Sequence, residues 1–161
     1  DHEIEQVIKA EEQSKANNYA LNLLSYRARS EKEIRDKLRR KGYEDNYIEN
    51  TIEFLYRYNY INDLEFGMLF AKDRQNFKKA GKRVIMNELY QKGVDKEVIS
   101  QIIDEIIDPD EELQRALELA EKKAVSYKND DRNAKYRKLS AFLARKGYSF
   151  DIISKVLKEV L

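Results

Sequence analysis

A Leu-x-x-Lys-Gly phrase occurs three times in the chain, and its glycines, Gly42, Gly93 and Gly147, lie 51 and 54 residues apart. Each copy follows an amphipathic stretch, and apolar residues at helical spacing come soon after it, as Ile48 and Ile52 do after the first. Glycine ends a helix readily because it adopts the left-handed conformation without steric cost. A repeat of about 50 residues with one such stop predicts a tandem helical array.

The composition favours helices throughout. The 161 residues include one proline and five glycines, while Leu, Ile, Glu, Lys, Arg and Ala dominate. We therefore predict an all-α fold of tandem three-helix-bundle repeats, three units that form an elongated curved rod. The predicted division is an acidic helical lead-in over residues 1–18, followed by repeats at 19–60, 61–107 and 108–161. The sequence starts at Asp1 rather than at methionine, which is consistent with a fragment of a longer protein.

Local signals define the helices of the first repeat. The first helix includes residues 19–26, and Ser30 with Glu33 forms a capping box that starts the second. Gly42 ends that second helix, and the third is expected over 46–58.

The later repeats carry weaker versions of the same signals. A helix is expected over 63–77, with Phe66, Phe70 and Leu69 facing inward. Gly81 then opens the next helix at the place that Ser30 holds in the first repeat. The third repeat begins at Asp108-Pro109, a cap followed by proline in the first turn. The polar stretch 128–133 is predicted to be a flexible loop.

Eleven tyrosines could suggest base stacking on nucleic acid, but the positions of several favour the core. Tyr19, Tyr26, Tyr43 and Tyr148 lie at interior positions or beside turns, where we expect them to pack inside the protein.

Charge is segregated by repeat position, although the net charge is only +1. The segment 27–41 holds eight basic and three acidic residues, 72–92 holds seven and two, and 132–146 holds six and none. Acidic residues dominate in 44–65 and 95–121. Solvated faces normally mix both signs, so the recurring basic block indicates a binding surface for a polyanion or a repeating acidic partner.

The candidate binding residues are the cations of these blocks. They are Arg27, Arg29, Lys37, Arg39, Arg40 and Lys41 in the first repeat, Arg74, Lys78, Lys79, Lys82, Arg83 and Lys92 in the second, and Arg137, Lys138, Arg145 and Lys146 in the third. The alternative is that they are only solvated helix formers.

Several other functions are disfavoured. There is no cysteine, and His2 is the only histidine, so no catalytic residue, metal ligand or cofactor is predicted. No apolar run approaches the roughly 20 residues that cross a bilayer, so no membrane partner is expected. A helix-turn-helix DNA reader is disfavoured because the third helices are rich in carboxylates, which phosphate would repel.

The combination of motifs resembles the RecX family of regulators of the RecA recombinase. The resemblance is carried by the run 20–33 with Leu38-Arg-Arg-Lys-Gly42, by Tyr60-Ile-Asn-Asp63 and Gly81-Lys-Arg83, and by Phe142-Leu-Ala-Arg-Lys-Gly147. It covers about residues 19–161. The matching motifs are mostly caps, core leucines and stop glycines, so they identify the fold better than the contact residues.

The resemblance implies a bacterial cytoplasmic protein, not an enzyme, that acts in DNA repair, recombination and the SOS response. Such a protein binds the RecA filament on DNA in its helical groove and inhibits ATP hydrolysis, strand exchange and co-protease activity. Single- and double-stranded DNA are further expected partners, and we expect a monomer. Two rival functions remain open: a direct, sequence-independent DNA-binding protein, and a helical-repeat scaffold for an acidic protein partner.

Overall fold

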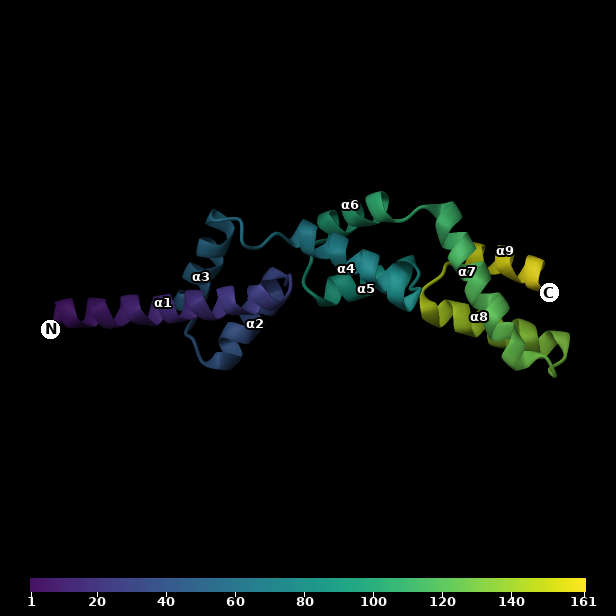
Figure 1. The fold of residues 1–161 in the computed structure, drawn as a ribbon, viewed down its shortest axis with the longest axis horizontal. Helices are drawn as coiled ribbons and strands as arrows, with labels where there is room; N and C mark the ends of the chain where they lie inside the picture. Colours follow the sequence, from purple (N-terminus) through teal and green to yellow (C-terminus); the bar gives the residue numbers. More distant parts are fainter. The chain divides into compact units, whose positions relative to one another are not determined.

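The computed structural model describes all residues 1–161 and contains helices but no strands (Figure 1), which confirms the all-α prediction. The α-helices are α1 His2–Tyr26, α2 Glu31–Lys41, α3 Asp45–Arg57, α4 Asp63–Lys78, α5 Lys82–Gln91, α6 Lys96–Ile106, α7 Pro109–Ala124, α8 Arg132–Lys146 and α9 Phe150–Val160, and a 3₁₀ turn, η1, covers Val125–Tyr127. Every helix is too short or too polar to cross a lipid bilayer.

The chain forms two compact units. Unit 1 comprises residues 1–67 and 92–95, and unit 2 comprises 68–91 and 96–161. Residues of the second repeat therefore belong to both units, because its start at 61–67 and its turn at 92–95 group with the first repeat. The repeat boundaries proposed from the sequence stay a prediction.

In unit 1, α1, α2 and α3 pack around one apolar core. The buried residues of this core are Ala16, Ala20, Ile34, Leu38, Ile48, Ile52, Leu55 and Ile61. Alanines on α1 allow its backbone to approach the larger side chains of the two shorter helices. Tyr19 and Tyr43 pack against this core, with their ring centroids 6.4 Å apart.

The predicted ends of α2 are confirmed. The Ser30 hydroxyl accepts a hydrogen bond from the N–H of Glu33, and the Glu33 carboxylate accepts one from the N–H of Ser30, which completes the capping box. Gly42 ends the helix in the left-handed conformation, with φ of 100°. Gly147 has the same φ at the end of α8, and Gly93 has 85°.

In unit 2, α7, α8 and α9 enclose the second core. Its buried residues are Ala116, Ala120, Leu139, Leu143, Tyr148, Ile153, Val156 and Leu157. Tyr148 is 1% exposed, which confirms its predicted place in the core. Helices α5 and α6 also pack together in this unit and bury Ile85, Leu89, Ile99, Ile102 and Ile103.

Three local predictions were wrong or only partly right. Tyr26 is 78% exposed because it is the last residue of α1 and lies beyond the core contacts. Leu69 is 56% exposed, although Phe66 and Ala71 in the same helix are buried. The polar stretch 128–133 is shorter as a loop than predicted, since Asp131 caps α8 and the helix begins at Arg132.

Candidate interaction surface

One junction recurs in the two units, and its first copy lies in unit 1. It joins the start of α2 to the beginning of α4 and to the turn at 92–95. The Ser30 hydroxyl donates a 2.7 Å hydrogen bond to the carbonyl oxygen of Lys92, and the N–H of Glu31 donates a 2.9 Å bond to Oδ1 of Asp63. The cap of α2 thus holds residues that lie 32 and 62 positions later in the chain.

The second copy lies in unit 2 and joins the start of α5 to α7 and to the turn after α8. The N–H of Gly81 donates a 2.7 Å bond to the carbonyl oxygen of Lys146, and the N–H of Lys82 donates a 2.6 Å bond to Oε1 of Glu112. The Gly81 N–H here takes the place of the Ser30 hydroxyl. A carboxylate from the next repeat binds the following N–H in both copies.

Close backbone contact explains the glycines at the second copy. A Cβ atom added to Gly81 would lie 2.6 Å from the backbone carbon of Gly147, closer than real Cβ contacts allow. A Cβ on Gly147 would lie 2.6 Å from the nitrogen of Val84. The N–H of Arg83 completes the contact with a 3.0 Å bond to the carbonyl oxygen of Gly147. These contacts hold the start of α5 against the turn after α8.

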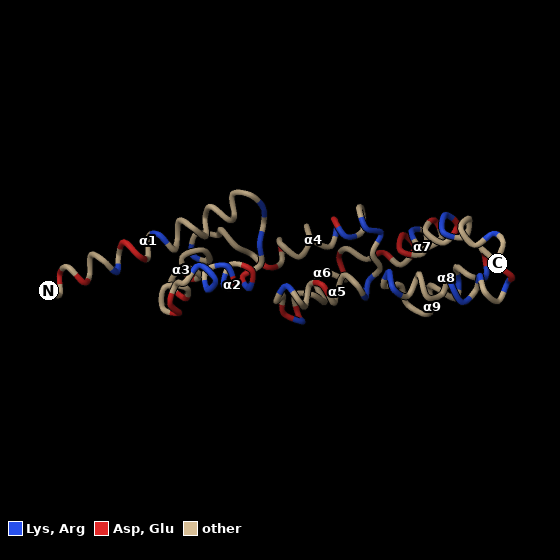
Figure 2. The backbone as a smooth tube through the Cα atoms, turned by 90° about the horizontal axis from the view of Figure 1, so that it is seen from below, with Lys and Arg blue, Asp and Glu red and all other residues tan.

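This junction gathers cations from two of the sequence blocks. We call the set the junction cluster, and it consists of Lys78 and Lys79 at the end of α4, Lys82 and Arg83 at the start of α5, and Arg145 and Lys146 at the end of α8. The Lys146 ammonium donates a 3.1 Å bond to the carbonyl oxygen of Lys78, which ties the two blocks together directly. Figure 2 shows the basic residues at the ends of α4 and α8 in this unit.

Most of the junction cluster carries charge that the chain does not neutralise. Lys78, Lys79, Lys82, Arg83 and Arg145 are exposed, and none of them forms an ion pair with a carboxylate of the chain. The carbonyl ends of α4 and α8 favour cations at these places, because each helix end carries partial negative charge. The result is a positive surface patch that is available to an anionic partner.

Buried groups beneath the cluster support it. The hydroxyl of Tyr148 donates a 2.6 Å bond to the carbonyl oxygen of Lys79, and burial raises the pKa of this tyrosine to about 12. Burial also raises the pKa of Glu112, although the N–H of Lys82 and the charges of Arg115 and Lys82 act in the opposite direction.

Three candidate cations, Arg27 and Arg29 of the first repeat and Lys92 of the second, form contacts within unit 1. Arg27 forms a 2.5 Å ion pair with Glu33, and Lys92 lies 3.7 Å from the same carboxylate. Because of the hydrogen bonds from Arg27 and from the N–H of Ser30, the pKa of Glu33 is lowered in spite of its burial. Arg29 donates a 3.2 Å bond from Nε to the carbonyl oxygen of Leu23.

The last turn of α2 keeps the exposed cations of the first repeat. Arg39, Arg40 and Lys41 are exposed there, while Lys37 is partly buried. Arg39 lies 3.6 Å from Asp36, and the Lys41 ammonium lies 5.5 Å from the ring centroid of Tyr19. These contacts leave most of the charge open to solvent.

Other candidates lie apart from the junction cluster. Arg74 pairs with Glu88 and stacks 4.5 Å from the ring centroid of Phe70. Lys138 forms a 2.7 Å ion pair with Asp130. Arg137 is exposed, but it precedes Arg145 by eight residues, or about 12 Å along α8. The structure therefore brings six of the predicted cations together in the junction cluster, keeps three more exposed in the last turn of α2, and places the others elsewhere.

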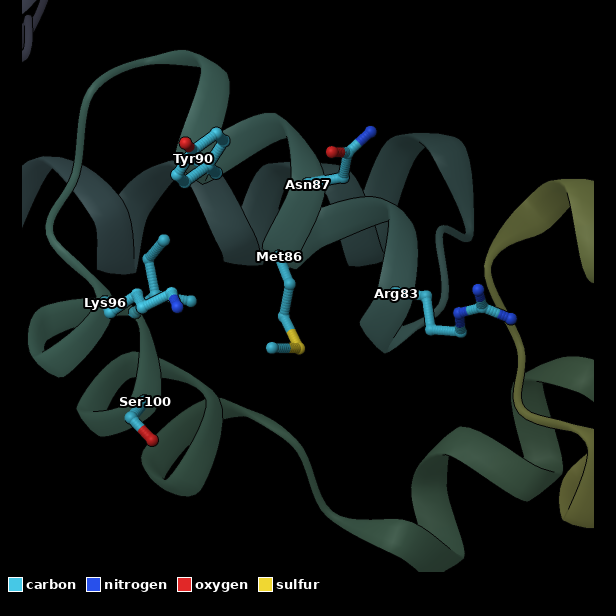
Figure 3. Close-up of a pocket in the computed structure, with 7 residues that line it drawn as sticks. Arg83, Met86, Asn87, Tyr90, Lys96 and Ser100 are labelled. Carbon is cyan, nitrogen blue, oxygen red and sulfur yellow. The ribbon is translucent and has the colours of Figure 1, made fainter.

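Sequence reasoning missed a groove between α5 and α6, shown in Figure 3. Its volume is about 510 Å³, and its lining consists of Arg83, Met86, Asn87 and Tyr90 from α5 and Lys96, Ile99 and Ser100 from α6. The α5 residues follow the i, i+3, i+4, i+7 spacing of one helix face, which was a detectable signal. The sequence alone did not tell which face other helices would cover.

Three protein-family models match successive parts of the chain. The models are described as the first, second and third three-helix domains of RecX, and they match residues 16–55, 62–103 and 110–157.

Similar proteins span most or all of the chain. The "Regulatory protein RecX" of Clostridioides difficile (strain 630) is 35% identical over 161 residues, which are 100% of this chain and 75% of that protein. The protein of the same name from Amycolatopsis mediterranei (strain U-32) is 39% identical and covers 94% of this chain and 86% of its own length. Both names describe regulatory proteins rather than enzymes.

Two crystal structures resemble the fold. RecX from Lactobacillus salivarius is 33% identical, with a TM-score of 0.85 over 94% of this chain and 97% of that chain. A second structure, described as regulatory protein RecX, has a TM-score of 0.90 over 98% of this chain and 78% of that chain. Its 24% identity makes it evidence for the fold alone.

Proposed function

The chain belongs to the RecX family, and from this premise we propose that it regulates the RecA recombinase by binding the filament that RecA forms on DNA. The observation that carries the proposal is the 35% identity to a RecX protein along the whole chain. In this proposal the protein lies in the helical groove of the filament, in the bacterial cytoplasm. It inhibits ATP hydrolysis, strand exchange and co-protease activity, and so acts in recombination, repair and the SOS response.

The junction cluster supports a mechanism for this binding. Lys78, Lys79, Arg83 and Arg145 are exposed and form no ion pair within the chain, so they are free to meet acidic side chains or phosphates of a filament. The cations in the last turn of α2 form a second exposed set. Several weak contacts on one chain add up to firm binding, because each contact raises the effective concentration of the next.

Direct, sequence-independent DNA binding is the second candidate, and the same unpaired cations favour it. A protein that binds only phosphates loses affinity steeply as salt rises, since each phosphate contact releases counterions. The filament proposal differs from it in one respect. Binding to the filament also uses contacts with RecA, so inhibition does not require coating of the DNA.

The experiment that tests the proposal compares two titrations at the same salt concentration. In one, increasing amounts of the chain are added to RecA during ATP hydrolysis stimulated by single-stranded DNA. In the other, the chain is added to the same DNA without RecA. We expect inhibition at concentrations well below those that coat the naked DNA. Inhibition only after the DNA is saturated, or no inhibition, would contradict the proposal.

A further inference from the structure

The groove between α5 and α6 lies wholly within unit 2, and its composition is that of a protein-binding site. The exposed hydrophobic side chains of its lining are Met86, which is 37% exposed, and Tyr90, which is 65% exposed. Met, Tyr and Arg are enriched in the cores of protein interfaces, and Met adapts its shape to different partners. A volume of about 510 Å³ is in the range of sites that hold a ligand.

The charges of the groove are of one sign. Arg83 lies at one end, beside the turn after α8, and Lys96 lies at the other end, near Tyr90 (Figure 3). Neither side chain forms an ion pair within the chain, and no lining residue is acidic. The absence of acidic residues from the lining is informative, because the chain contains 30 Asp and Glu residues. Asn87 and Ser100 add polar groups at the rim.

The spacing of the α5 residues that line the groove fits a short bound helix better than a nucleic acid. Arg83 and Tyr90 are separated by seven residues, so this face of α5 extends about 10 Å, or two helical turns. Amphipathic helices place apolar residues at i, i+3, i+4 and i+7 into such grooves. A phosphate backbone would instead require cations along the centre, where this groove has Met86 and Ile99.

We propose that the α5–α6 groove binds an acidic amphipathic peptide segment of a partner protein. Apolar side chains of the segment contact Met86, Tyr90 and Ile99, and its flanking carboxylates pair with Arg83 and Lys96. The proposal does not depend on the identity of the partner or on regulation of RecA, because its test uses the purified chain and a synthetic peptide alone.

The two methionines of the chain, Met68 and Met86, provide the readout. Only Met86 lines the groove. In protein labelled with ¹³C at the methionine methyl groups, the probe is a 15-residue helical peptide with leucines along one face and glutamates at both flanks. We expect it to shift the Met86 signal saturably and to leave the Met68 signal in place. The position of the Met68 signal also reports that the fold is intact.

Matched control peptides and protein variants separate the contribution of charge to binding from that of apolar contacts. A peptide with lysine in place of glutamate, or with alanine in place of leucine, should not saturate the Met86 shift. The double variant Arg83→Glu/Lys96→Glu should bind the acidic peptide about tenfold more weakly, because two attractive pairs become repulsive. The exposed control pair Lys122→Glu/Lys128→Glu should stay within about twofold of the unmodified chain. Tyr90→Ala should also weaken binding without changing any charge.

Three results would overturn the proposal. One is an unchanged Met86 signal, and another is an equal response to the acidic and the basic peptide. The third is displacement of the peptide by a single-stranded oligonucleotide that shifts Met86 at lower concentration, which would make the groove a nucleic-acid site.

Discussion

The backbone N–H of Lys82 donates a 2.6 Å hydrogen bond to Oε1 of Glu112, and this bond has a counterpart in unit 1, from the N–H of Glu31 to Oδ1 of Asp63. Each bond uses a free N–H at the start of a helix, a group that has no partner inside its own helix. In both cases the acceptor comes from the first helix of the next repeat. Repeats are thus joined through the caps of their second helices.

The Ser30 side chain makes two hydrogen bonds at this junction, whereas the Ser149 side chain, which caps α9, makes one. Ser30→Ala removes the cap of α2 and also leaves the carbonyl oxygen of Lys92 without its bond. Ser149→Ala removes only the exposed cap of α9. We expect a loss of about 1 kcal/mol in unfolding free energy for Ser149→Ala and about 2 kcal/mol for Ser30→Ala. Urea unfolding followed by circular dichroism measures both, and equal losses would contradict a contribution from the bond to Lys92.

Gly147 and Gly42 share a φ of 100° but differ in their surroundings. An added Cβ atom meets nothing within 4 Å at Gly42, whereas at Gly147 it would lie 2.8 Å from Cβ of Val84. Gly42→Ala should therefore cost about 1–2 kcal/mol from backbone strain alone. Gly147→Ala should cost at least about 1 kcal/mol more, because α5 must move. Hydrogen exchange at the N–H groups of Gly81 and Arg83 should be faster in Gly147→Ala only, which would show that the loss of stability arises at the contact between Gly147 and the start of α5.

Asp63 is a half-buried acceptor with an unfavourable charge. Burial raises its pKa, and the nearby charges of Glu31, Asp95 and Glu33 raise it further. Because the pKa in the folded protein is above that in the unfolded chain, the ionised carboxylate lowers stability at neutral pH. Stability is regained as the pH falls through the folded pKa. Asp63→Asn keeps an acceptor oxygen without the charge, so it should be more stable than the unmodified chain at pH 7.

The advantage of Asp63→Asn should disappear as the pH falls toward 3.8, the ordinary value for aspartate. Asp63→Ala instead leaves the N–H of Glu31 unpaired and should be about 1–3 kcal/mol less stable than Asp63→Asn at every pH. Asp73→Asn, at an exposed site, controls for the loss of one negative charge. If the stability difference between Asp63→Asn and the unmodified chain did not change with pH, this would contradict the raised pKa of Asp63.

The parts of the fold that were predictable depend on short-range signals. Ser30 with Glu33, and the stop glycines Gly42 and Gly147, act within a few residues of their positions. The inward face of a helix was readable only in part, since Phe66 is buried as predicted but Leu69 in the same helix is exposed. Tyr26 continues the apolar pattern of α1 in sequence, but the helix stops there and leaves the ring in solvent.

The candidate site depended on contacts that sequence spacing does not contain. Gly81 approaches Gly147 across 66 residues, and this contact brings Lys79 and Arg83 to Arg145. The same folding uses Arg27 and Arg29 in contacts within unit 1, although they looked like their exposed neighbours. Composition therefore located the basic blocks, and only tertiary structure showed which of their cations form contacts within the chain.

The most direct test of the account reverses charge in the junction cluster at residues that are exposed and have no carboxylate partner. Lys78→Glu/Lys79→Glu/Arg145→Glu is compared with Lys9→Glu/Lys122→Glu/Lys128→Glu, which makes the same change in net charge at exposed lysines elsewhere. The measurement is inhibition of the DNA-stimulated ATP hydrolysis of RecA. The account predicts that the cluster variant needs about tenfold more protein for half-inhibition, while the control stays within about twofold of the unmodified chain. Equal inhibition by the cluster variant and the unmodified chain would contradict it, as would an equal loss in both variants.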